Sequence, residues 1–130
     1  MSKVKIVLVE DDEVIAKVLH AGLLEAGFEV AVAETGETGL AAVRENKPDL
    51  VLLDLMLPEK HGFEVLAELK KSAETRAIPV IILTVMSADE DRKTAMLIGA
   101  SDYIVKSQYT SVEIIKKIKS FFAAEKRSKK

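Results

Sequence analysis

The chain has 130 residues, of which 48% are hydrophobic and 31% are charged, and its formal net charge is −2 at pH 7. This length suits one domain with its own core, and the composition argues against a disordered or fibrous protein. Because no cysteine is present, disulfides, thiolate nucleophiles and cysteine-bound metal sites are excluded. Only a short aliphatic run precedes Glu10, too short for a signal peptide or a membrane span, so we expect a cytoplasmic protein that makes no membrane contact.

The C-terminus differs in charge from the rest of the chain. Residues 125–130 carry four positive charges and one negative charge, which leaves residues 1–124 with a formal charge of −5. We interpret residues 1–124 as the folded domain and residues 125–130 as a basic C-terminal tail or linker stub. Such a short tail offers few contacts to phosphate groups, so no direct binding of nucleic acid is expected.

Apolar runs and helical periods alternate along the chain. The predicted strands are residues 5–9, 28–32, 50–53, 79–84 and 102–105. The predicted helices cover about residues 14–26, 37–45, 63–71, 88–98 and 111–122. Thr35 is predicted to cap the second helix. Two pairs, Ser87 with Glu90 and Thr110 with Glu113, have the spacing of capping boxes at the starts of the fourth and fifth helices.

Five strands that alternate with five helices indicate an α/β protein. The strands at residues 50–53 and 79–84 have no polar face, which is typical of parallel strands covered on both sides. We therefore predict a single doubly wound domain, in which a five-stranded parallel sheet carries helices on both faces through right-handed crossovers. The carboxyl ends of all the strands then lie along one edge, where open α/β sheets bind ligands.

Polar residues follow four of the predicted strands at this edge. They are Glu10, Asp11 and Asp12 after the first strand, Asp54 after the third, Thr84 at the end of the fourth and Lys106 after the fifth. Crowded carboxylates repel each other, which raises some of their pKa values or recruits a cation. Oxygen ligands without a partnered histidine or cysteine favour Mg²⁺, Mn²⁺ or Ca²⁺ over zinc. A metal, a lysine and a hydroxyl form a receptor for a phosphoryl group, and a carboxylate among them indicates phosphoryl transfer to aspartate. Which carboxylate is attacked stays open at this point.

Four motifs in a fixed order suggest a family. They are residues 9–12, Asp54 with Pro58 and Gly62, residues 79–84, and residues 102–106. In these motifs, residues 3–122 resemble the receiver domain of bacterial two-component response regulators. The resemblance implies a flavodoxin-like sheet with strand order 2-1-3-4-5 and a role as a phosphorylation-dependent switch in signal transduction. It does not imply an enzyme, beyond participation in the domain's own phosphorylation and dephosphorylation.

The resemblance also implies roles for individual residues. Asp54 would be the phosphoacceptor and would receive its phosphoryl group from a sensor histidine kinase or a phosphotransfer protein. Asp11 and Asp54 would bind Mg²⁺ directly, with Mn²⁺ as an alternative metal. Glu10 would act through a water molecule and Met56 through its backbone carbonyl.

Three further residues complete the site that the resemblance implies. Thr84 and Lys106 would contact the phosphoryl group. Thr84 and Tyr103 would pass its effect to the face formed by the fourth helix, the fifth strand and the fifth helix. The downstream partner or output domain is unknown from the sequence.

The chain departs from the family pattern at several positions. Val85 is bulkier than the small residue usual after the switch threonine, and we expect it to narrow access to Asp54. Ser107 follows Lys106 where the family commonly has proline, so the peptide between them takes either a costly cis form or a trans path. Met56 and Met86 cannot orient a water molecule, which leads to the hypothesis of a slow-decaying phosphoryl state.

Two alternative functions remain. One is a metal-dependent hydrolase that forms an aspartyl-phosphate, although such enzymes generally need an acidic residue two positions after the nucleophile, where this chain has Met56. The other is a pseudo-receiver that folds alike but acts as an interaction module without phosphorylation. His20 and His61 are interpreted as surface residues, because neither has a second imidazole or a carboxylate to orient it.

Overall fold

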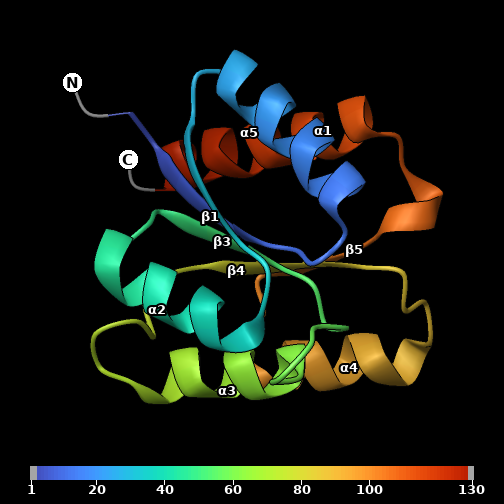
Figure 1. Ribbon diagram of the computed structural model, residues 1–130. Helices are drawn as coiled ribbons and strands as arrows, with labels where there is room; N and C mark the ends of the chain where they lie inside the picture. The colour runs from blue at the N-terminus through green and yellow to red at the C-terminus, as the bar shows by residue number, and fades with distance from the viewer. Residues whose placement is uncertain (1–2, 129–130) are drawn as a thin grey trace.

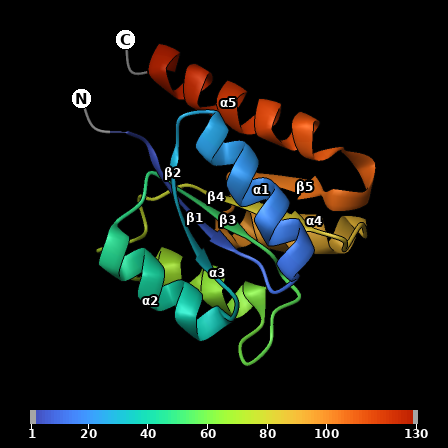
Figure 2. The ribbon, with the colours of Figure 1, turned by 45° about the horizontal axis from the view of Figure 1, so that its top comes forward.

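A computed structural model describes residues 3–128, with side chains described as far as Glu125, and shows a parallel β-sheet between two layers of helices (Figures 1 and 2). The strands are β1 (Lys5–Val9), β2 (Glu29–Ala33), β3 (Leu50–Leu53), β4 (Val80–Thr84) and β5 (Asp102–Val105). The helices are α1 (Glu13–Glu25), α2 (Gly36–Asn46), α3 (Gly62–Lys71), α4 (Asp89–Ile98), the 3-10 helix η1 (Lys106–Gln108) and α5 (Ser111–Ser128). None of the described helices is both long enough and apolar enough to span a membrane.

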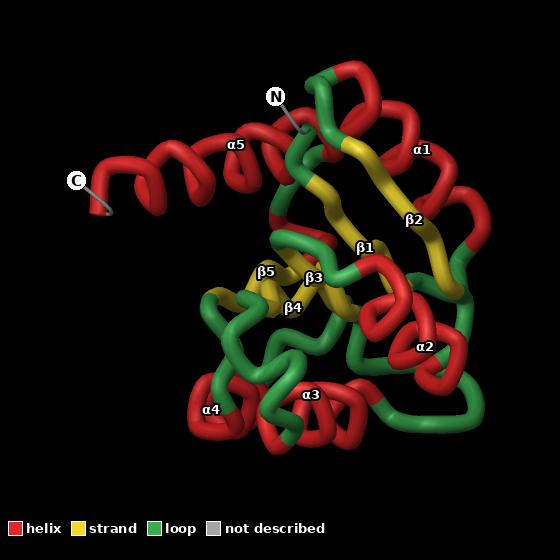
Figure 3. Tube along the Cα trace, turned by 90° about the vertical axis from the view of Figure 1, so that its left-hand side faces the viewer, coloured by secondary structure: helices red, strands yellow, loops and turns green. Residues whose placement is uncertain are grey.

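The strand order is β2-β1-β3-β4-β5 and all the pairings are parallel, which confirms the predicted doubly wound architecture. Strand β2 forms one edge beside β1 (Figure 3). Every residue of β3 and β4 is buried, which explains why these segments have no polar face in the sequence. Residues of both strands pack into apolar clusters on the two sides of the sheet, so neither face of these strands is left to solvent.

Alternate residues of each strand pack against opposite helix layers. Leu50 and Leu52 lie in a cluster with side chains of α1 and α5, whereas Val51 and Leu53 lie in a cluster with side chains of α2, α3 and α4. Figure 1 shows α1 and α5 on one side of the sheet and α2, α3 and α4 on the opposite side. The period of two along a strand therefore divides the apolar residues between two layers of core.

The helix starts agree with the sequence at two places and differ at a third. Thr35 caps α2, and the capping box of Thr110 and Glu113 forms with hydrogen bonds of 2.9 and 3.1 Å. The predicted box at Ser87 is wrong: α4 has Ala88 as its N-cap, and no side chain caps it. Ser87 lies one residue too early, and the acidic residues of the first turn of α4 supply the negative charge that favours a helix start.

The last helix is longer than its apolar stripe indicates. We predicted that it ends near residue 122, but α5 continues to Ser128. The added residues are mostly alanine, glutamate, lysine and arginine, which are strong helix formers without being apolar markers. Most of the segment interpreted as a basic tail is therefore helical, and its residues 129 and 130 lie outside the described part of the chain.

A pair of glycine substitutions tests how closely the helices pack. A Cβ atom at Gly39 in α2 would lie 2.8 and 3.0 Å from the Cγ atoms of Val9, which is buried in β1 and stiff at χ1. Helix propensity favours alanine by about 1 kcal/mol, but overpacking costs about 1–3 kcal/mol. We expect Gly39→Ala to lower the free energy of unfolding by about 1 kcal/mol in urea titrations.

Gly22→Ala in α1 is the matched control. Its Cβ would meet only the far end of the Ile115 side chain, which can change rotamer, so we expect a smaller loss or none. Equal losses in the two variants would contradict this account of the contact between α2 and β1.

Candidate functional site

Three acidic side chains meet at the carboxyl edge of the sheet. Glu10 follows β1 and Asp54 follows β3, and both are buried, with 1% and 5% of their surface exposed. Asp11 is exposed beside them. One carboxylate oxygen from each residue lies within 4.8 Å of the others. The donor set consists of hard oxygens, which suits Mg²⁺, Mn²⁺ or Ca²⁺.

The sheet ladder holds Glu10 and Asp54 in place. The Glu10 amide donates to the Ala33 carbonyl at 2.9 Å, and the Asp54 amide donates to the Val9 carbonyl at 3.1 Å. These bonds extend the pairing one residue beyond β1 and β3. The backbone that carries the two buried carboxylates is therefore part of the sheet and not of a free loop.

Lys106 links the two buried carboxylates. Its Nζ donates to Oδ2 of Asp54 at 2.8 Å and to Oε2 of Glu10 in a short hydrogen bond. Lys106 begins η1 directly after β5, and its side chain is 9% exposed. Every described peptide bond is trans, including the one between Lys106 and Ser107. Lys106 therefore reaches this position without a cis bond. The predicted convergence of β1, β3 and β5 at one point is confirmed.

The crowded charges shift two pKa values. Burial raises the pKa of Glu10 above its ordinary value, and the Asp54 charge adds to this, although the hydrogen bond and charge of Lys106 oppose it. Burial alone would lower the pKa of Lys106, but its hydrogen bonds to Asp54 and Glu10, together with their charges, raise it. Lys106 therefore stays positive, and Glu10 is harder to ionise than an ordinary glutamate.

The remaining acidic residue of the first motif has a different task. Asp12 is the N-cap of α1, and its Oδ1 accepts hydrogen bonds from the amides of Val14 at 3.0 Å and Ile15 at 3.1 Å. Its own amide donates to Glu10 at 3.2 Å. Asp12 thus anchors the helix start, while Glu10 and Asp11 face the acidic cluster.

The loop between β3 and α3 folds back against Asp54. A Cβ atom at Gly62 would overlap the backbone of Leu55 and the Asp54 carbonyl oxygen, so only glycine fits. The Gly62 amide donates to the Leu55 carbonyl at 2.8 Å, and the Met56 amide donates to Oδ1 of Asp54 at 3.1 Å. This packing explains in physical terms why glycine stands eight positions after Asp54.

Thr84 and Tyr103 lie near the same edge on β4 and β5. Thr84 is fully buried, and its Oγ1 accepts a long hydrogen bond from the Met86 amide at 3.4 Å. Tyr103 is 3% exposed, and its hydroxyl donates to the Met86 carbonyl at 2.7 Å. Both side chains are thus connected to one residue of the segment between β4 and α4.

Sequence patterns did not indicate some of the residues around this edge. Lys60 forms ion pairs with Glu37 of α2 at 3.1 Å and Glu68 of α3 at 2.6 Å, which ties the loop after β3 to two helices. His61 is exposed as predicted, and it also caps α3 through Nδ1, which accepts from the Phe63 amide at 3.0 Å. Its place just before the helix start is a signal for such a cap. The ion pairs of Lys60 leave no comparable signal.

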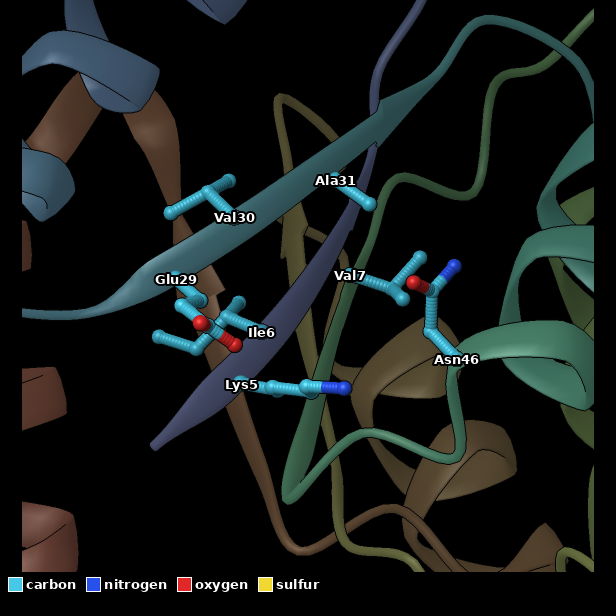
Figure 4. A pocket seen from close by; sticks show the side chains of 7 residues that line it. All are labelled: Lys5, Ile6, Val7, Glu29, Val30, Ala31 and Asn46. Carbon is cyan, nitrogen blue, oxygen red and sulfur yellow. The ribbon is translucent and has the colours of Figure 1, made fainter. Parts of the chain in front are cut away.

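A separate pocket of about 240 Å³ lies along β1 and β2 near the end of α2 (Figure 4). Lys5 and Glu29 begin these two strands, so the pocket lies toward the opposite edge of the sheet from Asp54. Its lining is otherwise aliphatic apart from Asn46. The acidic cluster with Lys106 is therefore the better candidate for chemistry.

Comparisons with known proteins agree on one family. The family described as response regulator receiver domain matches residues 6–119. The transcriptional regulatory protein AfsQ1 of Streptomyces coelicolor is 42% identical over 101 residues, which cover 78% of this chain and 44% of AfsQ1. This chain therefore spans less than half of the length of that relative.

Two solved structures share the fold. The Mn²⁺-bound form of response regulator Rcp1 has a TM-score of 0.82 and 30% identity, over 91% of this chain and 93% of that one. The BeF3-activated N-terminal receiver domain of RstA from Klebsiella pneumoniae has a TM-score of 0.79 and 33% identity, over 88% and 95% of the two chains. Together with the acidic cluster, the first of these supports a divalent metal at the site.

The raised pKa of Glu10 predicts how stability depends on pH when EDTA removes divalent metals. The folded protein holds the Glu10 proton more tightly than the unfolded chain, whose carboxyl group has the ordinary value of 4.5. The contribution of Glu10 to the free energy of unfolding therefore falls as pH rises through 4.5 toward the raised value. We expect the stability of the wild type relative to Glu10→Gln to decrease as the pH rises above 4.5 in urea titrations.

Glu34→Gln, at an exposed position after β2, serves as the control and should show no decrease of this size. A wild-type advantage that grows with pH would contradict the assignment.

Proposed function

The chain belongs to the response regulator receiver domain family, and we propose that it is a phosphorylation-dependent switch in which Asp54 accepts a phosphoryl group. The observation that carries this proposal is the position of Asp54. Its buried carboxylate ends a fully buried strand, lies beside Glu10 and Asp11, and accepts a hydrogen bond from Lys106. A nucleophilic oxygen, a candidate metal site and a fixed positive charge thus meet at one point.

Mg²⁺ is the proposed metal, with Mn²⁺ as an alternative. Asp11 and Asp54 would be direct ligands, Met56 would contribute its backbone carbonyl, and Glu10 would act through water. The chemistry supplied by such an ion is neutralisation of the crowded carboxylates and of the incoming phosphoryl oxygens. The structural support is the spacing of the three carboxylates and the single positive side chain, Lys106, that balances them in the described site.

In the proposed reaction, one Asp54 oxygen attacks the phosphorus of a phosphohistidine. A P–O bond forms, the P–N bond breaks, and the imidazole nitrogen of the donor keeps the electron pair. Lys106 contacts Asp54 from one side, where its ammonium group can also stabilise negative charge on the phosphoryl oxygens. The donor would be a sensor histidine kinase or a phosphotransfer protein, acting in the cytoplasm.

Thr84 and Tyr103 are the proposed switch residues. The hydroxyl of Thr84 accepts from the Met86 amide, and no acceptor takes its proton among the described residues, so it is free to donate to a phosphoryl oxygen. The proposed result is a population shift at the face formed by α4, β5 and α5, through which a downstream partner would bind. We place this unit in residues 1–124 and propose that residues 125–130, of which 125–128 continue α5, are a basic tail or linker stub. We assign the unit no direct contact with nucleic acid or membrane.

Intact-mass spectrometry tests the phosphoacceptor directly. With acetyl phosphate and Mg²⁺, we expect one phosphoryl adduct on the wild type, none on Asp54→Asn, and none on the wild type in EDTA. Asp12→Asn is the matched control, because asparagine keeps the helix cap and should allow normal labelling. An unlabelled wild type would favour a pseudo-receiver. Undiminished labelling of Asp54→Asn would contradict the assignment of Asp54 as the phosphoacceptor.

The lifetime of the adduct tests the hypothesis of a slow-decaying phosphoryl state. Met56 and Met86 lie two residues after Asp54 and Thr84; Met56 is 54% exposed and Met86 is half-buried, and neither side chain can orient an attacking water molecule. We expect Met56→Asn to accelerate loss of phosphate by roughly tenfold, because a positioned amide can hold that water. The rate is measured by the decay of the intact-mass adduct after the donor is removed.

Met96→Asn, at a half-exposed position of α4, is the control and should leave the decay rate unchanged. If the Met56→Asn adduct loses its phosphoryl group no faster than the wild-type adduct, the proposed reason for slow decay is contradicted.

A further inference from the structure

Tyr103 is held at both ends by groups from the segment that follows Thr84. Its hydroxyl donates to the Met86 carbonyl at 2.7 Å. Its backbone carbonyl accepts a hydrogen bond of 3.2 Å from Nη1 of Arg92, and the guanidinium carbon of Arg92 lies 4.9 Å from the centre of the Tyr103 ring. A hydrogen bond and a cation–π contact from one side chain therefore fix the backbone and the ring of Tyr103 together.

The direction of Arg92 is informative because acidic side chains surround it in the sequence. Asp89, Glu90 and Asp91 precede it in the first turn of α4. Among the described residues, however, no ion pair joins Arg92 to an acidic side chain, and its guanidinium group contacts Tyr103 through the hydrogen bond and the ring. An arginine oriented only by the neighbouring charges would turn toward these carboxylates. The orientation of Arg92 is therefore set by its contacts with Tyr103 in β5.

The attachment of α4 to the sheet is otherwise thin. Ala95 is its one buried residue, Leu97 is 88% exposed, and no side chain caps its start. Elements with few buried apolar contacts open at low free-energy cost. The contact of Arg92 with Tyr103 thus joins the loosely attached α4 to the rigid strand β5.

We propose that Arg92 is a positioning residue that holds Tyr103 in its inward position, the one in which the hydroxyl bonds to Met86. The contacts of Arg92 involve only protein groups, so they act whether or not Asp54 carries a phosphoryl group. Arg92 therefore sets the resting population of the inward state, from which phosphorylation shifts the equilibrium further. This inference rests on the proposed switch role of Tyr103, but its first test needs no phosphoryl donor.

The chain offers a clean spectroscopic test. It contains no tryptophan, and its two tyrosines are Tyr103 and Tyr109. Tyr109→Phe leaves Tyr103 as the single emitting side chain, and phenylalanine preserves the ring that faces Lys117. In this background, quenching of tyrosine fluorescence by acrylamide reports how often Tyr103 leaves its buried position.

We expect Arg92→Ala to raise the quenching constant roughly two- to fivefold and Arg92→Lys to give an intermediate value, because lysine keeps the charge but not the planar contact. Lys93→Ala is the control, since Lys93 is exposed and has no hydrogen bond, ion pair or ring contact in the described part of the chain. Circular dichroism confirms that each variant is folded. Equal quenching in the parent and in folded Arg92→Ala would overturn the proposal.

Titration of the Tyr103 phenol in Arg92→Ala gives a second test, because the two possible outcomes move its pKa in opposite directions. Burial raises the pKa of Tyr103, the nearby charge of Asp91 adds to this, and Arg92 opposes it. If Tyr103 stays inward without Arg92, its pKa rises further, which contradicts the proposal. If the side chain leaves its buried position, its pKa falls toward the ordinary 10.0, as the proposal requires.

Acetyl phosphate and Mg²⁺ then separate this proposal from the proposed function. When an adduct forms on Arg92→Ala, we expect the quenching constant to return toward that of the parent, because the phosphoryl group favours the inward state. A phosphorylated variant whose Tyr103 stays accessible would contradict the coupling between Asp54 and Tyr103. The role of Arg92 would still be supported by the difference measured without the donor.

Discussion

The contact of Lys106 with two buried carboxylates is the interaction on which the rest of the site depends. Glu10 and Asp54 are almost fully buried where an apolar sheet ends, and desolvation makes such charges costly. Removing one partner of a buried ion pair typically costs about 3–5 kcal/mol, because the other charge is left uncompensated. Lys106 therefore joins the ends of β1, β3 and β5 by electrostatics, where the apolar core has already brought them together.

The same arrangement keeps one side of the acidic cluster accessible to a cation. Asp11 is exposed although it lies next to buried Glu10, and the neighbouring Asp12 is occupied in capping α1. One carboxylate thus faces solvent while two are fixed by the sheet ladder and by Lys106. A site built this way is rigid on its protein side and accessible on the other, as expected for a hard cation that keeps several waters.

The sequence was most informative where the chemistry is local or periodic. Fully apolar runs identified β3 and β4, and the acidic residues directly after strands identified Glu10 and Asp54, because parallel strands bring their carboxyl ends to one edge. The capping box at Ser87 was wrong because a loop residue was taken for the helix start. Arg92 and Lys60 were missed because they act across folded contacts, to β5 and to α2 and α3, that leave no periodic pattern.

The backbone of Met86 links the proposed phosphorylation site to the proposed binding face. Its amide donates to Thr84 and its carbonyl accepts from Tyr103, so one residue contacts both proposed switch side chains. The bond to Thr84, at 3.4 Å, is long and correspondingly weak, whereas the bond to Tyr103, at 2.7 Å, is short. A shift of Thr84 toward a phosphoryl oxygen would therefore strain the weaker bond first and move the acceptor that holds the Tyr103 hydroxyl. Arg92 lies over the face of the same ring, which makes Tyr103 the point where the loop after β4 and the helix α4 influence one another.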